Sequence, residues 1–194
     1  MRGKKEIKII GITGTLGAGK GTVVEYLKTK GFNHLSVRGF LSEEVAHRGL
    51  PVNRDTLVSV ANDLRSKHSP GFIAEELYAR AVRSGDNCVI ESLRTLGEVQ
   101  ALKDRGNFYL FAVDADPLLR YERIVRRGSK TDNVSFEDFL THEKREMASD
   151  DPNKQNLSAC IAAADPRFRF LNNGTVFELR TKVDKALRSI KGIA

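Results

Sequence analysis

A glycine-rich segment near the start of the chain constrains its fold more than any other feature. The segment Gly14-Thr15-Leu16-Gly17-Ala18-Gly19-Lys20-Gly21-Thr22 follows an apolar run of strand length and precedes a segment with helical periodicity. Glycines allow positive φ angles, so consecutive backbone N–H groups can converge on a phosphate, at which the positive end of the following helix also points. The spacing predicts a phosphate-binding loop, with Lys20 placed against the β- and γ-phosphates.

The nucleotide contacts expected from this loop involve most of its residues. They are Gly14, Thr15, Gly17, Ala18, Gly19, Lys20, Gly21 and Thr22.

Beyond the loop, apolar runs of strand length alternate with segments of helical periodicity, which is typical of a parallel sheet covered by helices on both faces. The expected strands are Ile7–Thr13, Phe32–Val37, Asn87–Glu91, Asn107–Asp114 and Arg167–Leu171. These patterns predict an α/β, three-layer P-loop NTPase fold with a five-stranded parallel sheet. The 194 residues suit one hydrophobic core, so we expect a single domain over residues 1–194.

Capping signals predict where several helices begin. Asn53 is the expected N-cap of a helix over Arg54–Lys67. The dipeptides Ser69-Pro70 and Asp116-Pro117 are each expected to supply a cap and a proline in the first helical position.

Composition narrows the possible partners and compartment. The net charge of +7 favours partners that carry phosphate. The basic residues are dispersed and no aromatic-rich platform is visible, so nucleic acid is not the expected ligand. Two cysteines without disulfide or metal spacing suit a reducing compartment, and no apolar stretch reaches the length of a membrane span. We therefore expect a soluble, cytoplasmic protein.

An acid and an arginine follow the third predicted strand. Glu91 leaves this strand where ligands collect in parallel α/β sheets, so it is the candidate for organising Mg²⁺. Arg94 lies three residues further on, within reach of an acceptor phosphate that its guanidinium can bind with two hydrogen bonds.

A group of arginines, Arg120 to Arg127, precedes a polar loop at Ser129–Asn133. Arg123 and Arg127 are four residues apart and share one helix face. Positive charge beside a loop stabilises the negative charge that builds up on a phosphoryl group during transfer. We therefore predict a short arginine lid over residues 123–145, with Arg123 and Arg127 as catalytic residues beside Lys20 and Arg94.

Several of these segments resemble known families. The Gly19-Lys20-Gly21-Thr22 loop resembles that of adenylate kinases, in which magnesium is held largely through water, and this implies that Thr22 and Glu91 approach the metal through water. Arg94 resembles the arginine that follows the corresponding acid in nucleoside monophosphate kinases. Asn172-Asn173-Gly174 resembles the turn that lies against adenine in dephospho-coenzyme A kinases and adenylate kinases, which implies base contacts for Asn173 and Gly174.

Together the chain resembles a group of small P-loop kinase-like proteins related to adenylate kinase and dephospho-coenzyme A kinase. The stretch His47–Asp55 also resembles this group, and by that resemblance it lies in an acceptor-binding flap over residues 38–84. The usual acceptor signature is altered here, because Ser36–Ser42 replaces the Gly-Asp and downstream arginine of monophosphate kinases. Arg38 or Arg48 is the candidate replacement for that arginine.

These features predict ATP- and Mg²⁺-dependent phosphoryl transfer to a small nucleotide acceptor. An ionised phosphate acceptor needs positioning and charge neutralisation, whereas a hydroxyl acceptor usually benefits from a carboxylate base. No aspartate occurs between Phe32 and Arg54, which favours a nucleoside monophosphate. Two alternatives remain: activity of the dephospho-coenzyme A kinase type, and a nucleotide-gated ATPase or switch protein without kinase activity.

Overall fold

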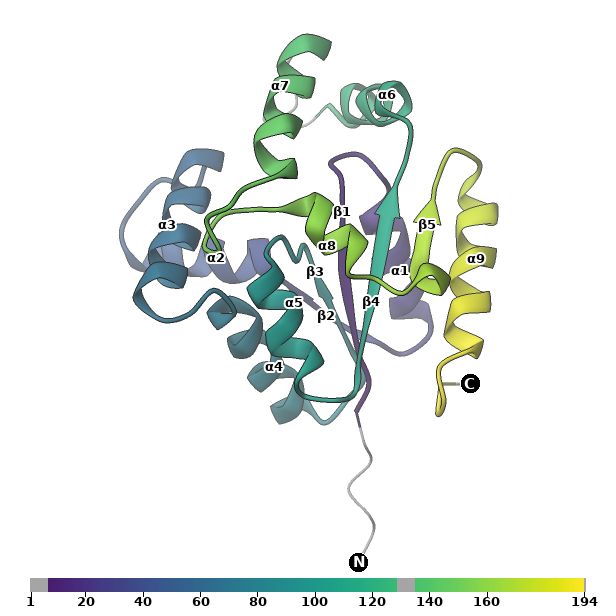
Figure 1. Ribbon diagram of the computed structural model, residues 1–194. Coiled ribbons are helices and arrows are strands. Elements are labelled where there is room, and N and C mark those ends of the chain that lie inside the picture. Colours follow the sequence, from purple (N-terminus) through teal and green to yellow (C-terminus); the bar gives the residue numbers. More distant parts are fainter. Residues whose placement is uncertain (1–6, 129–134, 194) are drawn as a thin grey trace, which may run out of the picture.

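Five parallel strands form one sheet in the computed structural model, which describes residues 7–128 and 135–193 (Figure 1). The strand order is β2-β3-β1-β4-β5. The strands are β1 (Ile9–Gly14), β2 (Asn33–Ser36), β3 (Cys88–Glu91), β4 (Phe108–Asp114) and β5 (Arg169–Leu171). The predicted fold class is confirmed, and each predicted strand is present with bounds that shift by one or two residues.

Helices separate the strands along the chain. They are α1 (Lys20–Thr29), α2 (Val37–His47), α3 (Arg54–Lys67), α4 (Phe72–Ser84), α5 (Leu96–Lys103), α6 (Pro117–Arg127), α7 (Phe136–Met147), α8 (Leu157–Ala162) and α9 (Val176–Arg188), with a 3₁₀ turn η1 (Pro166–Phe168) before β5. None of the helices in the described ranges combines the length and the apolar character that crossing a lipid bilayer requires.

Two of the predicted helix starts are confirmed. The Asn53 side chain accepts a hydrogen bond from the Thr56 amide, and the Thr56 hydroxyl contacts the Asn53 backbone in return. Asp116 caps α6 with Pro117 in its first turn.

The prediction for Ser69-Pro70 is wrong, because α4 begins at Phe72 with Gly71 as its N-cap. The Phe72 amide donates to the Ser69 carbonyl, and the Pro70 carbonyl accepts from the Thr95 hydroxyl. Pro70 also lies so close to Gly97 that a Cβ there would come within 2.4 Å of its side chain. Pro70 therefore belongs to a turn that packs on the start of α5.

Side chains of the central strands point alternately into two hydrophobic cores. Ile9 and Ile90 lie in a core with residues from α2, α3, α4, α5 and α8. Ile10 and Phe111 lie in the opposite core with residues from α1 and α9. Figure 1 shows the same three layers, with α6 and α7 beyond the carboxyl ends of the strands. The loops at that end are therefore the ones free to form a site.

The second core predicts a large effect of one aromatic truncation. Phe111 is fully buried and lies between Phe168 and Phe170, with ring centroids 5.2 Å away in both cases. Phe111→Ala should lower the free energy of unfolding by about 3–5 kcal/mol, because it removes buried contacts and leaves a cavity. The matched control is Phe177→Ala, since Phe177 is 78% exposed; its effect should stay within about 0.5 kcal/mol. Urea unfolding measures both, and equal losses would contradict the placement of Phe111.

Candidate nucleotide-binding site

The phosphate loop joins β1 to α1 at the carboxyl end of the sheet. Gly17 and Gly19 take φ angles of 78° and 104°, which non-glycine residues rarely adopt. Within the described residues, the backbone amides of Leu16, Gly17 and Gly19 donate to no protein acceptor. Free amides beside a helix N-terminus suit an anion.

The carbonyl groups of this loop, in contrast, are bonded by side chains. Lys20 Nζ donates to the carbonyls of Gly14 and Thr15 at 2.9 and 2.8 Å. Asn172 Nδ2 donates to the Ala18 carbonyl at 2.8 Å, and Arg120 Nη1 donates to the Leu16 carbonyl at 3.3 Å. These contacts hold the carbonyls and leave the amides available.

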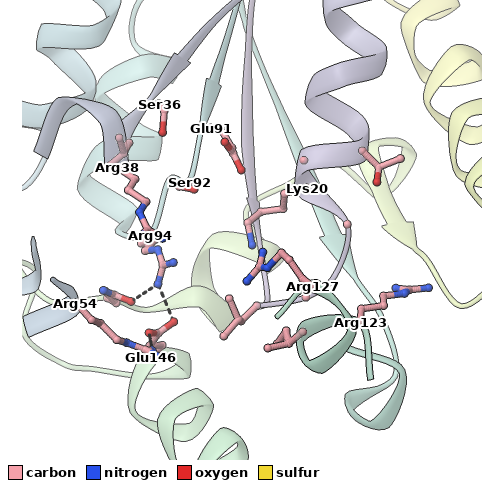
Figure 2. Close-up of a pocket in the computed structure, with 18 of the residues that line it drawn as sticks. Lys20, Ser36, Arg38, Arg54, Glu91, Ser92, Arg94, Arg123, Arg127 and Glu146 are labelled. Atoms are coloured by element: carbon pink, nitrogen blue, oxygen red, sulfur yellow. Dashed lines mark hydrogen bonds and ion pairs between the residues drawn. The ribbon is translucent and has the colours of Figure 1, made fainter. Parts of the chain in front are cut away.

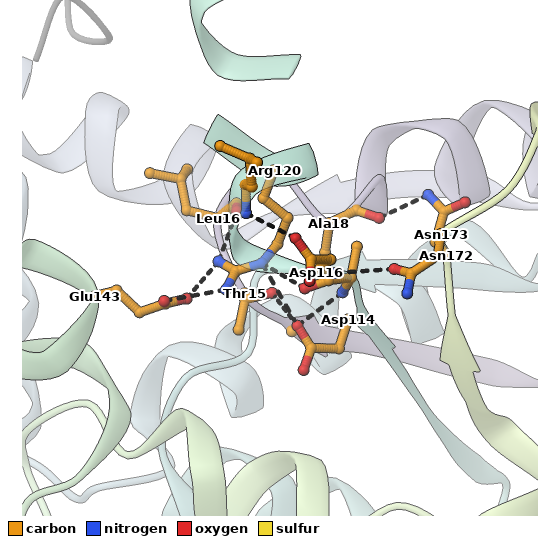
Figure 3. Close-up of polar contacts among 12 residues, drawn as sticks. Thr15, Leu16, Ala18, Asp114, Asp116, Arg120, Glu143, Asn172 and Asn173 are labelled. Carbon is orange, nitrogen blue, oxygen red and sulfur yellow. Dashed lines mark hydrogen bonds and ion pairs between the residues drawn. The ribbon is translucent and has the colours of Figure 1, made fainter. Parts of the chain in front are cut away.

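Arg120 connects the loop to both helices beyond the sheet (Figure 3). Its guanidinium also donates to the Ala115 carbonyl at 2.8 Å and pairs with Glu143 of α7. Thr15 adds a further contact, from its hydroxyl to Asp114 Oδ1 at 2.6 Å. The sequence places Arg120 in the arginine group without assigning this role, since two of its partners, Leu16 and Glu143, come from other segments of the chain.

Two glycines of the loop lie against these supports. A Cβ on Gly17 would come within 2.6 Å of the Arg120 carbonyl oxygen. A Cβ on Gly19 would come within 2.4 Å of Asn172 Nδ2. The loop therefore needs glycine at both positions for space as well as for conformation.

A cavity of about 660 Å³ opens beside the loop. Eight basic side chains line it: Lys20, Arg38, Arg54, Arg65, Arg94, Arg123, Arg126 and Arg127. Its acidic lining consists of Glu91 and Glu146. This excess of positive charge inside one cavity favours a ligand with several negative charges.

Lys20 lies half-buried among these charges. The pKa of its ammonium group is lowered to about 8. Loss of hydration on burial is the main cause and the positive charge of Arg94 is the second, while the negative charge of Glu91 partly opposes them. A bound anion would favour the charged form and raise this pKa.

Glu91 lies at the end of β3 and lines the cavity, as expected for a strand-end acid. Its Oε2 lies 3.2 Å from His34 Nε2, and β2 and β3 pair so that Ser36 is opposite Glu91. Ser36 and Thr22 also line the cavity. No cluster of three or more His, Cys, Asp or Glu side chains suited to a metal occurs among residues 7–128 and 135–193.

Arg94 takes part in an ion-pair network on the other side of the cavity (Figure 2). Its Nη1 donates to Glu146 Oε2 at 2.7 Å and to Gln155 Oε1 at 2.8 Å. Arg54, at the start of α3, pairs with the other oxygen of Glu146. The sequence gives little sign of this network, because Glu146 lies on a polar helix whose partner arginines are far away in the chain.

A buried ion pair fixes the backbone of Arg94. Arg65 Nη2 donates to Glu98 Oε1 at 2.7 Å, and the two side chains are 2% and 0% exposed. The other Glu98 oxygen accepts from the amides of Arg94 and Thr95. Removing one partner of such a pair would leave an uncompensated charge in the protein interior. The pair thereby joins α3 to the turn that carries Arg94.

The predicted site residues divide into two groups. Ten line the cavity: Gly17, Gly19, Lys20, Gly21, Thr22, Glu91, Arg94, Arg123, Arg127 and Gly174. Gly14, Thr15, Ala18 and Asn173 do not line it. Asn173 Oδ1 instead accepts from the Asp116 amide at 2.8 Å, so its predicted base contact stays a prediction.

The arginine lid is described only in part, because residues 129–134 of the predicted segment lie outside the described residues. Figure 2 shows Lys20 and Arg127 pointing toward the same region, whereas Arg123 points away from it. Arg123 Nη2 donates to the Asn172 carbonyl at 2.9 Å. The catalytic roles of both arginines remain predictions.

The structure separates the two candidates for the altered acceptor signature. Arg38, in the first turn of α2, lines the cavity. Arg48 is not among the lining residues and pairs with Glu44 and Asp63. Arg38 is therefore the better placed of the two.

The loop geometry predicts opposite effects for one substitution at two neighbouring glycines. Gly19→Ala should lower the free energy of unfolding by at least about 1 kcal/mol, because alanine is strained at positive φ and its Cβ meets Asn172. Gly21 lies in α1 with nothing within 4 Å of an added Cβ. Gly21→Ala should instead raise it by about 0.4–1 kcal/mol. Thermal or urea unfolding of both variants provides the measurement, and a stable Gly19→Ala protein would contradict this loop geometry.

Comparisons with known proteins agree with this architecture. A UPF0200 protein of Sulfurisphaera tokodaii is 28% identical over 184 residues, which cover 95% of this chain and 98% of that relative. Among solved structures, TT1252 from Thermus thermophilus aligns with a TM-score of 0.66 at 19% identity over 97% of this chain and all of that one. A dephospho-CoA kinase from Campylobacter jejuni aligns with a TM-score of 0.51 at 14% identity, covering 94% and 97% of the two chains.

At these identities the structural matches establish the fold alone, and it is the P-loop NTPase-like α/β fold that the sequence predicts. A protein-family model described as AAA domain matches residues 10–148, which include the phosphate loop, Glu91, Arg94 and the three helices whose arginines line the cavity, α2, α3 and α6. That match covers most of the chain, and the protein therefore belongs to the AAA domain family.

Proposed function

We propose that this protein transfers the γ-phosphate of ATP to a small acceptor that itself carries a phosphate, in the simplest case a nucleoside monophosphate. The observation that carries the proposal is the charge of the cavity, whose lining contains seven basic residues besides the buried Arg65, which pairs with Glu98, and only two acids. A donor triphosphate and an acceptor phosphate together would supply the negative charge that this cavity lacks.

The two ends of the cavity suit two different phosphate groups. The phosphate loop and Lys20 form the donor end, where free amides meet a lysine. Arg38, Arg54 and Arg94 come from the predicted acceptor flap and from the turn after β3, and they form the acceptor end. Arg127 points toward the same region as Lys20 and would reach the phosphoryl group in transfer.

The oxygen donors present fit a magnesium ion held mainly by the nucleotide and by water. Thr22 and Glu91 both line the cavity, and Mg²⁺ usually keeps several waters when phosphates supply its other ligands. When bound, the ion would neutralise charge on the β- and γ-phosphates. Glu91 would accept hydrogen bonds from its waters.

A hydroxyl acceptor is a second candidate, because the cavity does contain one carboxylate suited to act as a base. Glu91 lines it within 3.2 Å of His34, a contact that the sequence did not predict. Under this alternative, Glu91 would accept the hydroxyl proton. The single carboxylate at this place, against three acceptor-side arginines, favours the phosphate acceptor.

A substrate panel tests the proposal. With ATP and Mg²⁺, nucleoside monophosphates should produce acceptor-dependent ADP, and they should be better substrates than dephospho-coenzyme A in a coupled assay. Lys20→Met should abolish the activity, and Arg94→Gln should raise the KM for the acceptor by about tenfold or more, the value of one lost charged hydrogen bond. ADP formation that ignores every acceptor would contradict the proposal and indicate an ATPase, and preference for dephospho-coenzyme A would indicate the hydroxyl alternative.

The lowered pKa of Lys20 predicts that nucleotide binding takes up protons. The pKa of about 8 in the free protein means that Lys20 is largely neutral at pH 8.5. A bound polyphosphate favours the ammonium form and raises the pKa, so binding at this pH should draw a fraction of a proton from the buffer, and affinity should fall as the pH rises above 8.

Titration calorimetry at pH 8.5, in two buffers with different ionisation enthalpies, measures this uptake. Lys20→Met is the control and should show none. Proton release by the unmodified protein, or identical uptake by the variant, would contradict the role given to Lys20.

A further inference from the structure

Glu146 holds the acceptor-side arginines in a way that imitates a bound phosphate. Arg54 pairs with one of its carboxylate oxygens and Arg94 with the other, the latter at 2.7 Å. The two arginines come from different elements, the start of α3 and the turn after β3. An anion with an arginine on each of two oxygens is the arrangement by which proteins commonly bind phosphates.

Glu146 is in the right place and charge state to act on ligand binding. It lines the nucleotide cavity, and its side chain is 15% exposed. Burial alone would raise the pKa of this carboxyl, but Arg94 and Arg54 outweigh it and hold the pKa below its ordinary value. Glu146 is therefore ionised at neutral pH and neutralises two cations that an acceptor would otherwise meet.

The helix that carries Glu146 also contacts the donor side. Glu143 lies three residues earlier on α7 and pairs with Arg120, which supports the phosphate loop at the Leu16 carbonyl. Residues three apart lie on the same side of a helix. A displacement of Glu146 would therefore act on a helix that contacts both ends of the cavity.

We propose that Glu146 is a built-in competitor for the phosphate of the acceptor, and that this phosphate displaces its carboxylate from Arg54 and Arg94. The inference rests on the proposed function, because it assumes that these arginines receive the acceptor. The displaced carboxylate moves into water while the two arginines stay paired. Only molecules in which Glu146 has left the arginines can bind the acceptor phosphate. The apparent affinity for the acceptor therefore falls in proportion to the fraction of such molecules, and Glu146 sets the acceptor KM in this way.

Inorganic phosphate is a suitable probe, because it tests the arginine site without catalysis. The protein is first titrated with ADP and Mg²⁺ to fill the phosphate loop, and phosphate is then titrated by calorimetry. The binding that Arg94→Gln removes is scored as the acceptor site. Glu146→Gln should tighten it by about tenfold, as expected when a competitor that holds the site in most molecules is lost.

Glu137→Gln is the matched control, since Glu137 is an exposed acid on the same helix, and it should leave phosphate affinity unchanged. Glu146→Asp keeps the charge on a shorter side chain and should give an intermediate affinity. Equal or weaker phosphate binding in Glu146→Gln, or no phosphate site dependent on Arg94 in either protein, would overturn the proposal.

A measurement on the unmodified protein covers the case in which Glu146→Gln fails to fold. With ¹³C-labelled glutamate carboxyls, phosphate should move the Glu146 resonance toward the position of exposed glutamates such as Glu137. A phosphate-saturated protein with an unmoved Glu146 resonance would overturn the inference. A phosphate-dependent shift in a protein that shows no kinase activity would uphold the inference about the arginine site and reject the proposed function alone.

Discussion

The phosphate loop can offer its amides to an anion because side chains from elsewhere hold its carbonyls. Side chains donate hydrogen bonds to the carbonyls of four loop residues, Gly14, Thr15, Leu16 and Ala18. The donors are Lys20, Arg120 and Asn172. A peptide unit whose carbonyl is fixed on one side must direct its N–H to the other. The loop is therefore shaped before any ligand arrives, and the ends of β4 and β5 supply the segments that carry two of these donors.

The acceptor side is organised around charge rather than around backbone amides. Several arginines share one cavity, and their mutual repulsion is relieved only where an acid pairs with them. The buried Arg65–Glu98 pair places the backbone of Arg94, and Glu146 places its guanidinium. Positions and charges on this side thus depend on partners from α3, α5 and α7.

The sequence predicted what is encoded locally. The strands depend on short-range periodicity, and the Asn53 cap depends on one side chain and a nearby amide. The phosphate loop depends on closely spaced glycines. Ser69-Pro70 was misread because the packing of Pro70 on Gly97 decides that turn. The roles of four charged residues, Arg54, Arg65, Arg120 and Glu146, were not assigned from the sequence. Their main ion-pair partners are distant in the chain, and no sequence motif marks these pairs. Two acids three residues apart on one helix, Glu143 and Glu146, are a local trace of the arginine network.

Asn172, near the end of the chain, packs directly against Gly19, near its start. The amide nitrogen of Asn172 fills the space that any side chain at position 19 would need, and it also bonds the neighbouring Ala18 carbonyl. A larger residue at position 172 would push on the loop, and a smaller one would release it. Because the positive φ already requires glycine at position 19, natural variation at position 172 should consequently be confined to side chains of about the size of asparagine.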